Sequence, residues 1–151
     1  MDFLPIGIRI SNARILIVGG GRVATHKALI LNRFTNRVTV VAPDISADIR
    51  NLPFQCIERC FQPSDLEGVT LLYICTNNRQ LNRSIREAAE REGVLVNVCD
   101  SPSECDFVSP AVFGSGSLTI SVASDAKDVK RSIRVRNNIK EAIENGSLRI
   151  D

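Results

Sequence analysis

The residues whose spacing points most clearly to a chemistry are three consecutive glycines near the start of the chain. Residues 19–24, GGGRVA, fit the pattern G-x-G-x-x-A and directly follow the apolar run at 15–18. Gly19 permits a tight turn, Gly21 lets the backbone approach a pyrophosphate, and the small Ala24 lets a helix pack close to a strand. Free N–H groups at the start of that helix would bind the phosphates. The pattern predicts a dinucleotide site; the alternative is a nucleotide-free α/β domain that keeps the same turn.

A carboxylate that binds the adenosine ribose of a dinucleotide is expected about 20 residues after the glycines, beyond the second strand. Asp44 stands at this distance from Ala24 and directly follows Pro43, which ends a β-branched run. An acidic residue at this place, rather than an arginine, favours NAD over NADP.

Polar side chains also end two later strands of the expected sheet. Thr76 and Asn77 follow one apolar run, and Asn97 and Asp100 close the next. The carboxyl ends of parallel strands meet at one edge of a sheet, where such folds bind ligands. Burial of Asp100 beside a nicotinamide would raise its pKa and suit it to proton transfer. The alternative is that Asp100 only caps the turn before Pro102.

The elements that must position these residues alternate along the first hundred residues. Short apolar runs predict strands, and one-sided apolar stripes predict helices. The strands are expected at 15–18, 37–43, 54–60, 69–76 and 94–100, a capped turn at 64–68, and helices at 23–34 and from Asn77 or Asn78 to Arg91. This order predicts an α/β fold, a Rossmann-like parallel sheet with helices on both faces.

After Asp100 the pattern changes. Two β-rich runs flank GSGS at 114–117, which predicts a hairpin, and a basic helix is expected from about Asp125 to Glu144. The last ~40 residues are too few for an independent core, so they should pack on the first part or on a second copy of the chain. We expect a Rossmann domain at 1–112 and a second region at 113–151.

Composition bounds the function further. The chain of 151 residues is 44% hydrophobic with a net charge of +2, which favours neither nucleic acid nor a membrane as a partner. No apolar run approaches the ~20 residues that span a bilayer, and the N-terminus has no basic region typical of a signal peptide. Five cysteines without a CxxC pair, with a single histidine, predict reduced thiols in a cytoplasmic protein and no metal site.

Several motifs together resemble the siroheme synthase N-terminal family, that is, precorrin-2 dehydrogenase / sirohydrochlorin ferrochelatase. They are LIVGGGRVATHKA, VTVVAPD, ICTNN and, most specifically, VNVCDSP followed by DFVSPAVF. The resemblance covers nearly the whole chain. It implies an NAD-binding Rossmann domain followed by a dimerisation region, a homodimer, and NAD-dependent oxidation of precorrin-2 to sirohydrochlorin. Some members of the family then insert Fe²⁺.

The resemblance also assigns roles to residues. It implies NAD contacts at Arg22, Val23, Pro43 and Asp44. It implies an essential aspartate at Asp100, used in both reactions, and a serine near the tetrapyrrole at Ser124. Where the family usually has glycines after this serine, the present chain has Asp125 and Ala126, whereas the basic Arg136 is retained.

Six cations between residues 127 and 140 leave two readings of the last helix open. They form a solvated, partly dimeric face, or some of them, Arg136 included, bind the carboxylates of precorrin-2. Nucleic acid is disfavoured because no aromatic stacking platform accompanies the charge. Two further functions also remain open: an NAD-binding regulatory or sensor domain without turnover, and a protein-interaction domain.

Overall fold

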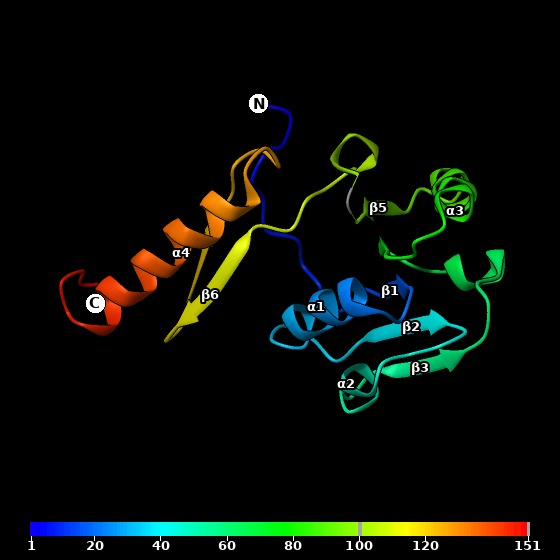
Figure 1. The fold of residues 1–151 in the computed structure, drawn as a ribbon, viewed down its shortest axis with the longest axis horizontal. Coiled ribbons are helices and arrows are strands. Elements are labelled where there is room, and N and C mark those ends of the chain that lie inside the picture. The colour runs from blue at the N-terminus through cyan, green and yellow to red at the C-terminus, as the bar shows by residue number, and fades with distance from the viewer. Residues whose placement is uncertain (100, 151) are drawn as a thin grey trace. The chain divides into compact units, whose positions relative to one another are not determined.

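The computed structural model describes residues 1–99 and 101–150 (Figure 1). The chain forms two compact units. One is Gly7–Phe107, and the other combines Met1–Ile6 with the chain from Val108 onward. Each unit is described separately below.

The larger unit is built on a five-stranded parallel sheet. Its strands are β1 (Ile15–Val18), β2 (Val38–Ala42), β3 (Gln55–Glu58), β4 (Leu71–Ile74) and β5 (Leu95–Val98). Their spatial order is β3-β2-β1-β4-β5, and β1 pairs in parallel with both β2 and β4. The chain therefore proceeds to one side from β1 and then to the other, which leaves a crevice between β1 and β4 at the carboxyl ends of the strands.

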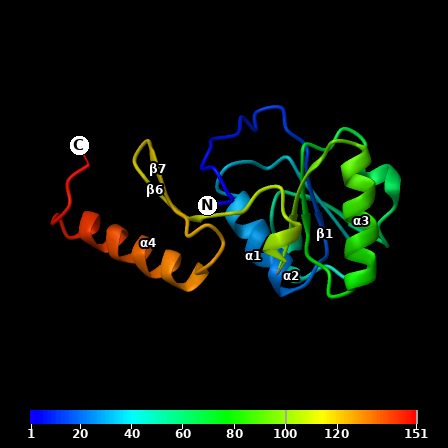
Figure 2. The same cartoon turned by 90° about the horizontal axis from the view of Figure 1, so that it is seen from above.

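Helices cover both faces of this sheet, as the sequence predicts. The helices are α1 (Arg22–Leu31), α2 (Ala47–Arg50) and α3 (Arg79–Arg91). Alternate residues of β1 face opposite sides: Ile15 and Ile17 share a core with Ala28 of α1, whereas Leu16 shares one with Ile85 of α3. Figure 2 shows α1 and α3 on opposite sides of β1.

Element ends differ from expectation by a few residues. Helix α1 ends at Leu31, and the N–H of Phe34 closes a tight turn on the Leu31 carbonyl, which leaves the Phe34 side chain 46% exposed. The capped turn expected at 64–68 is a 3₁₀ turn, Pro63–Leu66. A second 3₁₀ turn, Pro102–Glu104, and the single-turn helix α2 carry too few residues to show an apolar period.

The smaller unit contains a hairpin and one helix. Strands β6 (Ala111–Ser115) and β7 (Leu118–Val122) pair antiparallel, and α4 spans Val129–Glu144. The expected boundary between residues 112 and 113 falls within β6, and the larger unit ends at Phe107. Among residues 1–99 and 101–150, no helix has both the length and the apolar character needed to cross a bilayer.

Helix α4 begins later than the expected Asp125. Asp125 and Ala126 have φ values of 56° and 59°, which are left-handed and cannot belong to a right-handed helix. The helix begins instead after Asp128, whose carboxylate accepts the N–H of Arg131 at 2.8 Å. An N-cap of this kind satisfies a backbone donor that the first turn leaves without an intrahelical partner.

Candidate functional site

The glycine segment forms a sharp bend between β1 and α1. Gly19 has a φ of 123°, and a Cβ added there would lie 2.4 Å from the carbonyl oxygen of Cys75. A Cβ at Gly20 would lie 2.0 Å from the carbonyl oxygen of Asp44. The bend therefore needs glycine at both positions, because the loops that follow β2 and β4 press against its backbone. The sequence predicts the turn at Gly19 but not the need for Gly20, which arises from contact with a distant loop.

Gly21 differs from the two glycines before it. A Cβ added at Gly21 would meet no atom within 4 Å, and the residue is the N-cap of α1. No side chain caps this helix, and its first turn contains no acidic residue. The N–H groups and the positive dipole end of α1 therefore have no protein carboxylate in the first turn to neutralise them. Open space beside such donors fits the diphosphate of a dinucleotide.

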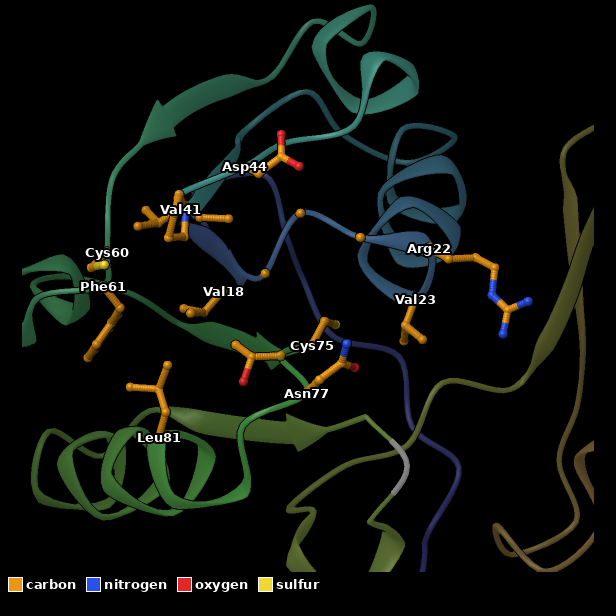
Figure 3. Close-up of a pocket in the computed structure, with 16 residues that line it drawn as sticks. Val18, Arg22, Val23, Val41, Asp44, Cys60, Phe61, Cys75, Asn77 and Leu81 are labelled. Carbon is orange, nitrogen blue, oxygen red and sulfur yellow. The ribbon is translucent and has the colours of Figure 1, made fainter.

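This bend borders a cavity of about 620 Å³ at the carboxyl ends of the strands (Figure 3). The cavity lies within the larger unit, at the crevice that the strand order predicts. Eight of the nine residues expected to contact the cofactor line it: Gly19, Gly21, Arg22, Val23, Pro43, Asp44, Thr76 and Asn77.

An apolar wall of the cavity was not predicted from the sequence. It is formed by Val18, Val41, Phe61 and Leu81, which come from four different elements or loops (Figure 3). The pattern of the sequence makes Val18 and Val41 strand residues, but nothing local indicates that Phe61 and Leu81 reach the same cavity. Such a wall suits the flat ring of a nucleotide base.

The loop that carries Phe61 is fixed by a two-pronged ion pair. Arg59 donates to both carboxylate oxygens of Asp65, with Nη1–Oδ2 at 2.8 Å and Nη2–Oδ1 at 2.6 Å. The N–H of Gln62 also donates to Asp65, at 2.8 Å. The hydrogen bond from Arg59, followed by that from Gln62, lowers the pKa of the Asp65 carboxyl against the opposing effect of burial. These three bonds stabilise the loop that forms this side of the cavity.

Asp44 presents an accessible carboxylate at the rim of the cavity. Its side chain is 98% exposed, and the nearest cation, Arg50 Nη2, lies 3.7 Å away. Arg50 itself is paired with Glu58 of β3, with 3.0 Å between its Nε and the carboxylate. Arg50 therefore interacts more closely with Glu58 than with Asp44, and the exposed Asp44 carboxylate can accept hydrogen bonds from hydroxyl groups.

Thr76 and Asn77 connect β4 to α3. The hydroxyl of Thr76 bonds the side chain of Asn82, whose Nδ2 donates back to the Thr76 carbonyl at 3.0 Å. Asn78 caps α3 by accepting the N–H of Leu81 at 3.0 Å. Thr76 is thus held in place by the helix cap, while the side chain of Asn77 lies near Cys75 (Figure 3).

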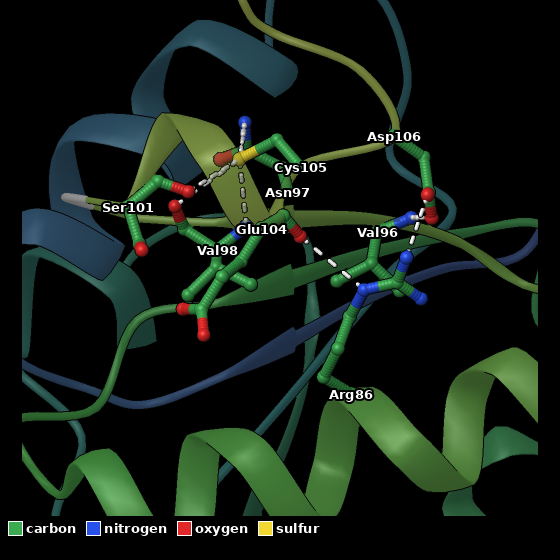
Figure 4. Close-up of polar contacts among 8 residues, drawn as sticks. All are labelled: Arg86, Val96, Asn97, Val98, Ser101, Glu104, Cys105 and Asp106. Carbon is green, nitrogen blue, oxygen red and sulfur yellow. Dashed lines mark hydrogen bonds and ion pairs between the residues drawn. The ribbon is translucent and has the colours of Figure 1, made fainter.

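The segment after β5 folds back along that strand (Figure 4). Asp106 accepts the N–H of Val96 at 2.9 Å, and its other carboxylate oxygen lies 2.7 Å from Arg86 Nη2 of α3. The Arg86 side chain also donates to the Glu104 carbonyl at 3.2 Å. The Asp106 side chain therefore satisfies the N–H of Val96 on β5, which is an edge strand of the sheet.

Asn97, the ninth expected cofactor residue, does not line the cavity. Its side chain is 4% exposed, and Nδ2 donates to the carbonyl of Phe107 at 2.9 Å. The structure thus gives Asn97 a part in holding the segment that follows β5. Asp100, the expected catalytic residue, lies outside the described residues.

The two expected tetrapyrrole contacts belong to the smaller unit, and both make contacts within it. Ser124 Oγ accepts the N–H of Asp128 at 3.0 Å. Arg136 Nη1 donates to the carbonyl of Val112 at 2.9 Å, which ties α4 to β6. Arg136 Nε also donates to Asn137 Oδ1 at 2.8 Å, so its Nη2 group and the hydroxyl proton of Ser124 are the donors left for a second partner among the bonds that the described residues make.

Asp125, at a position where the resemblance implies a glycine, is a bound carboxylate. Lys127 Nζ lies 2.6 Å away, and the N–H groups of Asp2 and Phe3 donate to it at 2.7 and 2.9 Å. These bonds, that of Lys127 first, lower the pKa of Asp125 to about 2. The added negative charge is therefore compensated inside the unit, and it fastens the N-terminal residues there.

Comparison with known proteins agrees with this geometry. Residues 6–111 match the family model NAD_binding_7, described as "Putative NAD(P)-binding". The chain is 36% identical over 142 residues to siroheme synthase of Stutzerimonas stutzeri and 34% identical over 129 residues to that of Nitrosomonas europaea, which covers 90% and 82% of the chain. The chain spans only 30% and 27% of the length of these two relatives.

A solved structure shows the same fold. "SirC, precorrin-2 dehydrogenase" superposes with a TM-score of 0.80 over 92% of this chain and 70% of that one, at 22% identity. The expected Rossmann-like architecture and the resemblance to the siroheme synthase N-terminal family are confirmed. So is the expectation of a nicotinamide dinucleotide as cofactor. With a family model matching most of its length, this chain belongs to the NAD(P)-binding family NAD_binding_7.

Proposed function

We propose that this chain is an NAD-dependent dehydrogenase that oxidises precorrin-2 to sirohydrochlorin in siroheme biosynthesis. The observation that carries the proposal is the glycine bend, with open space at Gly21, bordering a cavity of about 620 Å³ at the crevice of the sheet. The names of the relatives, siroheme synthase and precorrin-2 dehydrogenase, support the substrate.

The residues present fit NAD in chemical terms. Backbone N–H groups at the start of α1, beside Gly21, would hold the diphosphate. Asp44 would accept hydrogen bonds from the hydroxyl groups of the adenosine ribose, and its negative charge disfavours the extra phosphate of NADP. The apolar wall that includes Phe61 and Leu81 would exclude water from the adenine.

Once bound, the dinucleotide supplies a hydride acceptor; the protein supplies placement and proton transfer. A hydride leaves a reduced carbon of the macrocycle, and a proton leaves the adjoining position. In our proposal Asp100 accepts that proton, because the sequence resemblance implies an essential aspartate at this position and a carboxylate can act as a general base. Ser124 and Arg136 of the smaller unit are proposed contacts of the tetrapyrrole.

Anaerobic incubation of the chain with precorrin-2 and NAD⁺ tests the proposal, with the absorbance of sirohydrochlorin as the readout. We expect product from the wild type and at least a 100-fold lower rate from Asp100→Asn, which retains the shape of the residue but removes the base. Binding of NAD⁺ by the wild type without turnover would favour the sensor function. Unchanged turnover by Asp100→Asn would remove the role of Asp100 as base.

We further propose that the chain acts as a cytoplasmic homodimer through residues 113–151. In that region Leu118, Val129 and Ile133 are exposed apolar side chains, which a partner subunit would cover. Sedimentation analysis of the intact chain tests this, and a monomer at micromolar concentration would contradict it.

Insertion of Fe²⁺ would depend on Asp100 and is tested by adding Fe²⁺ anaerobically to the product and recording the siroheme spectrum.

A further inference from the structure

Two cysteines stand side by side at the carboxyl ends of β4 and β5. These strands pair in parallel with Ile74 opposite Val98, so the next residues, Cys75 and Cys99, are also opposite each other. The N–H of Cys99 donates to the carbonyl of Ile74 at 2.9 Å, which continues the ladder. Their Sγ atoms are 2.7 Å apart, and neither cysteine is in a disulfide.

The backbone at this place suits a disulfide bond. A disulfide needs Cα atoms about 4.4–6.8 Å apart and a sulfur–sulfur distance of about 2.05 Å. Neighbouring strands lie about 4.8 Å apart, within that range. The sulfurs of Cys75 and Cys99 therefore need to approach by only about 0.7 Å from their observed separation.

The pair also touches the cavity. Cys75 is among the residues that line it, and the carbonyl oxygen of Cys75 lies where it would meet a Cβ at Gly19. Formation of the bond would draw the Cys75 sulfur toward Cys99 and so change the wall of the cavity beside the glycine bend. We propose that Cys75 and Cys99 are a site of reversible disulfide formation by hydrogen peroxide, and that the disulfide weakens binding of the dinucleotide in the adjoining cavity.

The reaction balances with peroxide as the oxidant. One thiol is oxidised to a sulfenic acid as hydrogen peroxide is reduced, with release of one water. The second thiol attacks that sulfur, which forms the S–S bond and releases a second water. A dithiol reductant reverses the reaction by thiol–disulfide exchange.

Cys105, the nearest other thiol in sequence to Cys99, is engaged with the backbone. Its Sγ accepts the N–H of Val98 at 3.2 Å and lies 3.3 Å from the carbonyl oxygens of Val98 and Ser101. Cys60 lines the same cavity and is exposed, which makes it a matched control for a thiol without a facing partner cysteine.

Coupling between the disulfide and the cavity rests on the proposed function and is reciprocal. If the disulfide weakens binding of the dinucleotide, the bound dinucleotide must disfavour the disulfide by the same factor. The dinucleotide would also cover Cys75 and slow access of the peroxide. Both effects predict slower oxidation of the pair when NAD⁺ is present.

The first experiment treats the intact, reduced chain with hydrogen peroxide, alkylates the remaining thiols and identifies linked peptides by mass spectrometry without reduction. We expect a Cys75–Cys99 link that a dithiol reverses, that Cys75→Ser and Cys99→Ser abolish, and that Cys60→Ser leaves unchanged. A link between Cys99 and Cys105, or oxidation of both thiols to sulfinic acids without a link, would overturn the proposal.

The second experiment titrates NAD⁺ into the reduced and the linked chain. We expect at least tenfold weaker binding by the linked chain, recovery after reduction, and slower linking in saturating NAD⁺. Equal affinity of both forms would overturn the coupling and leave the modification site standing. If the reduced chain binds no NAD⁺, the proposed function fails together with the coupling, whereas the link, which needs no cofactor, is judged by the first experiment alone.

Discussion

The glycine bend of the larger unit and the turn before α4 of the smaller unit solve a similar backbone problem with different residues. Gly19 has a positive φ of 123°, which glycine adopts without steric cost. Asp125 and Ala126 also have positive φ values, 56° and 59°, although each carries a Cβ. The first bend is possible because its glycines have no Cβ, whereas the second is stabilised by hydrogen bonds and an ion pair of the Asp125 side chain.

Those bonds explain how the second turn persists. Each non-glycine residue in the left-handed conformation costs roughly 1–2 kcal/mol. The Asp125 carboxylate, 5% exposed, accepts the N–H groups of Asp2 and Phe3 and pairs with Lys127. Contacts with a segment more than a hundred residues away therefore stabilise the turn, and these contacts cannot be predicted from the local sequence.

The largest effect is expected from filling the space at the glycine bend. Gly20→Ala places a Cβ 2.0 Å from the Asp44 carbonyl oxygen, which belongs to backbone and cannot swing aside. We expect the free energy of unfolding to fall by about 3 kcal/mol or more and NAD⁺ binding to weaken at least 100-fold. Urea denaturation and calorimetric titration measure the two effects. Gly7→Ala is the control, because its added Cβ meets nothing within 4 Å, and a Gly20 variant as stable as this control would contradict the packing described here.

A smaller effect is expected at the ion pair that fixes the apolar wall. Asp65→Asn should lower the free energy of unfolding by about 1–2 kcal/mol at neutral pH, because charge-assisted bonds from Arg59 are lost. The lowered pKa of Asp65 sets the sign of the pH dependence. Its contribution is present above the unfolded pKa of about 3.9 and is lost as the pH falls through the lower folded value.

Thermal unfolding of the wild type and Asp65→Asn between pH 2 and pH 7 checks this dependence. The gap between the two proteins should be widest at neutral pH and should shrink below about pH 4. A gap that grows on acidification would show that Asp65 is not stabilised as a carboxylate.

The smallest effect is a gain in stability at the second turn. Ala126→Gly removes a Cβ from a left-handed residue, and it should raise the free energy of unfolding by about 0.5–1 kcal/mol after the added flexibility of the unfolded chain is counted. Asp125→Gly relieves the same conformation but removes the carboxylate that binds Asp2 and Phe3, so it should give no gain. Chemical denaturation of both variants decides; a gain from Asp125→Gly larger than that from Ala126→Gly would show that the bonds of Asp125 contribute little.

The sequence predicts the larger unit better than the smaller one, because most features of the larger unit are local in the sequence whereas the turn before α4 depends on distant contacts. Apolar runs, the glycine pattern and the distance from Ala24 to Asp44 are local features, and they locate the five strands and one wall of the cavity. Phe61, Leu81 and the bonds of Asn97 depend on how separate segments meet, which a linear pattern does not contain. The late start of α4 was not predicted, because the conformation of Asp125 is stabilised by hydrogen bonds from the N–H groups of Asp2 and Phe3, which a local pattern does not show.

The central claim is that the open space at Gly21 receives the diphosphate of NAD⁺. Gly21→Val tests it most directly: the residue has extended backbone, φ −86° and ψ −165°, which valine adopts, and its added side chain meets no protein atom within 4 Å of the Cβ. Calorimetric titration with NAD⁺ should show binding by the wild type and at least 30-fold weaker binding by Gly21→Val, while the free energy of unfolding should fall by only about 1 kcal/mol, because valine is a poorer N-cap than glycine. Equal affinity in the two proteins would contradict the account, since the diphosphate would then bind elsewhere.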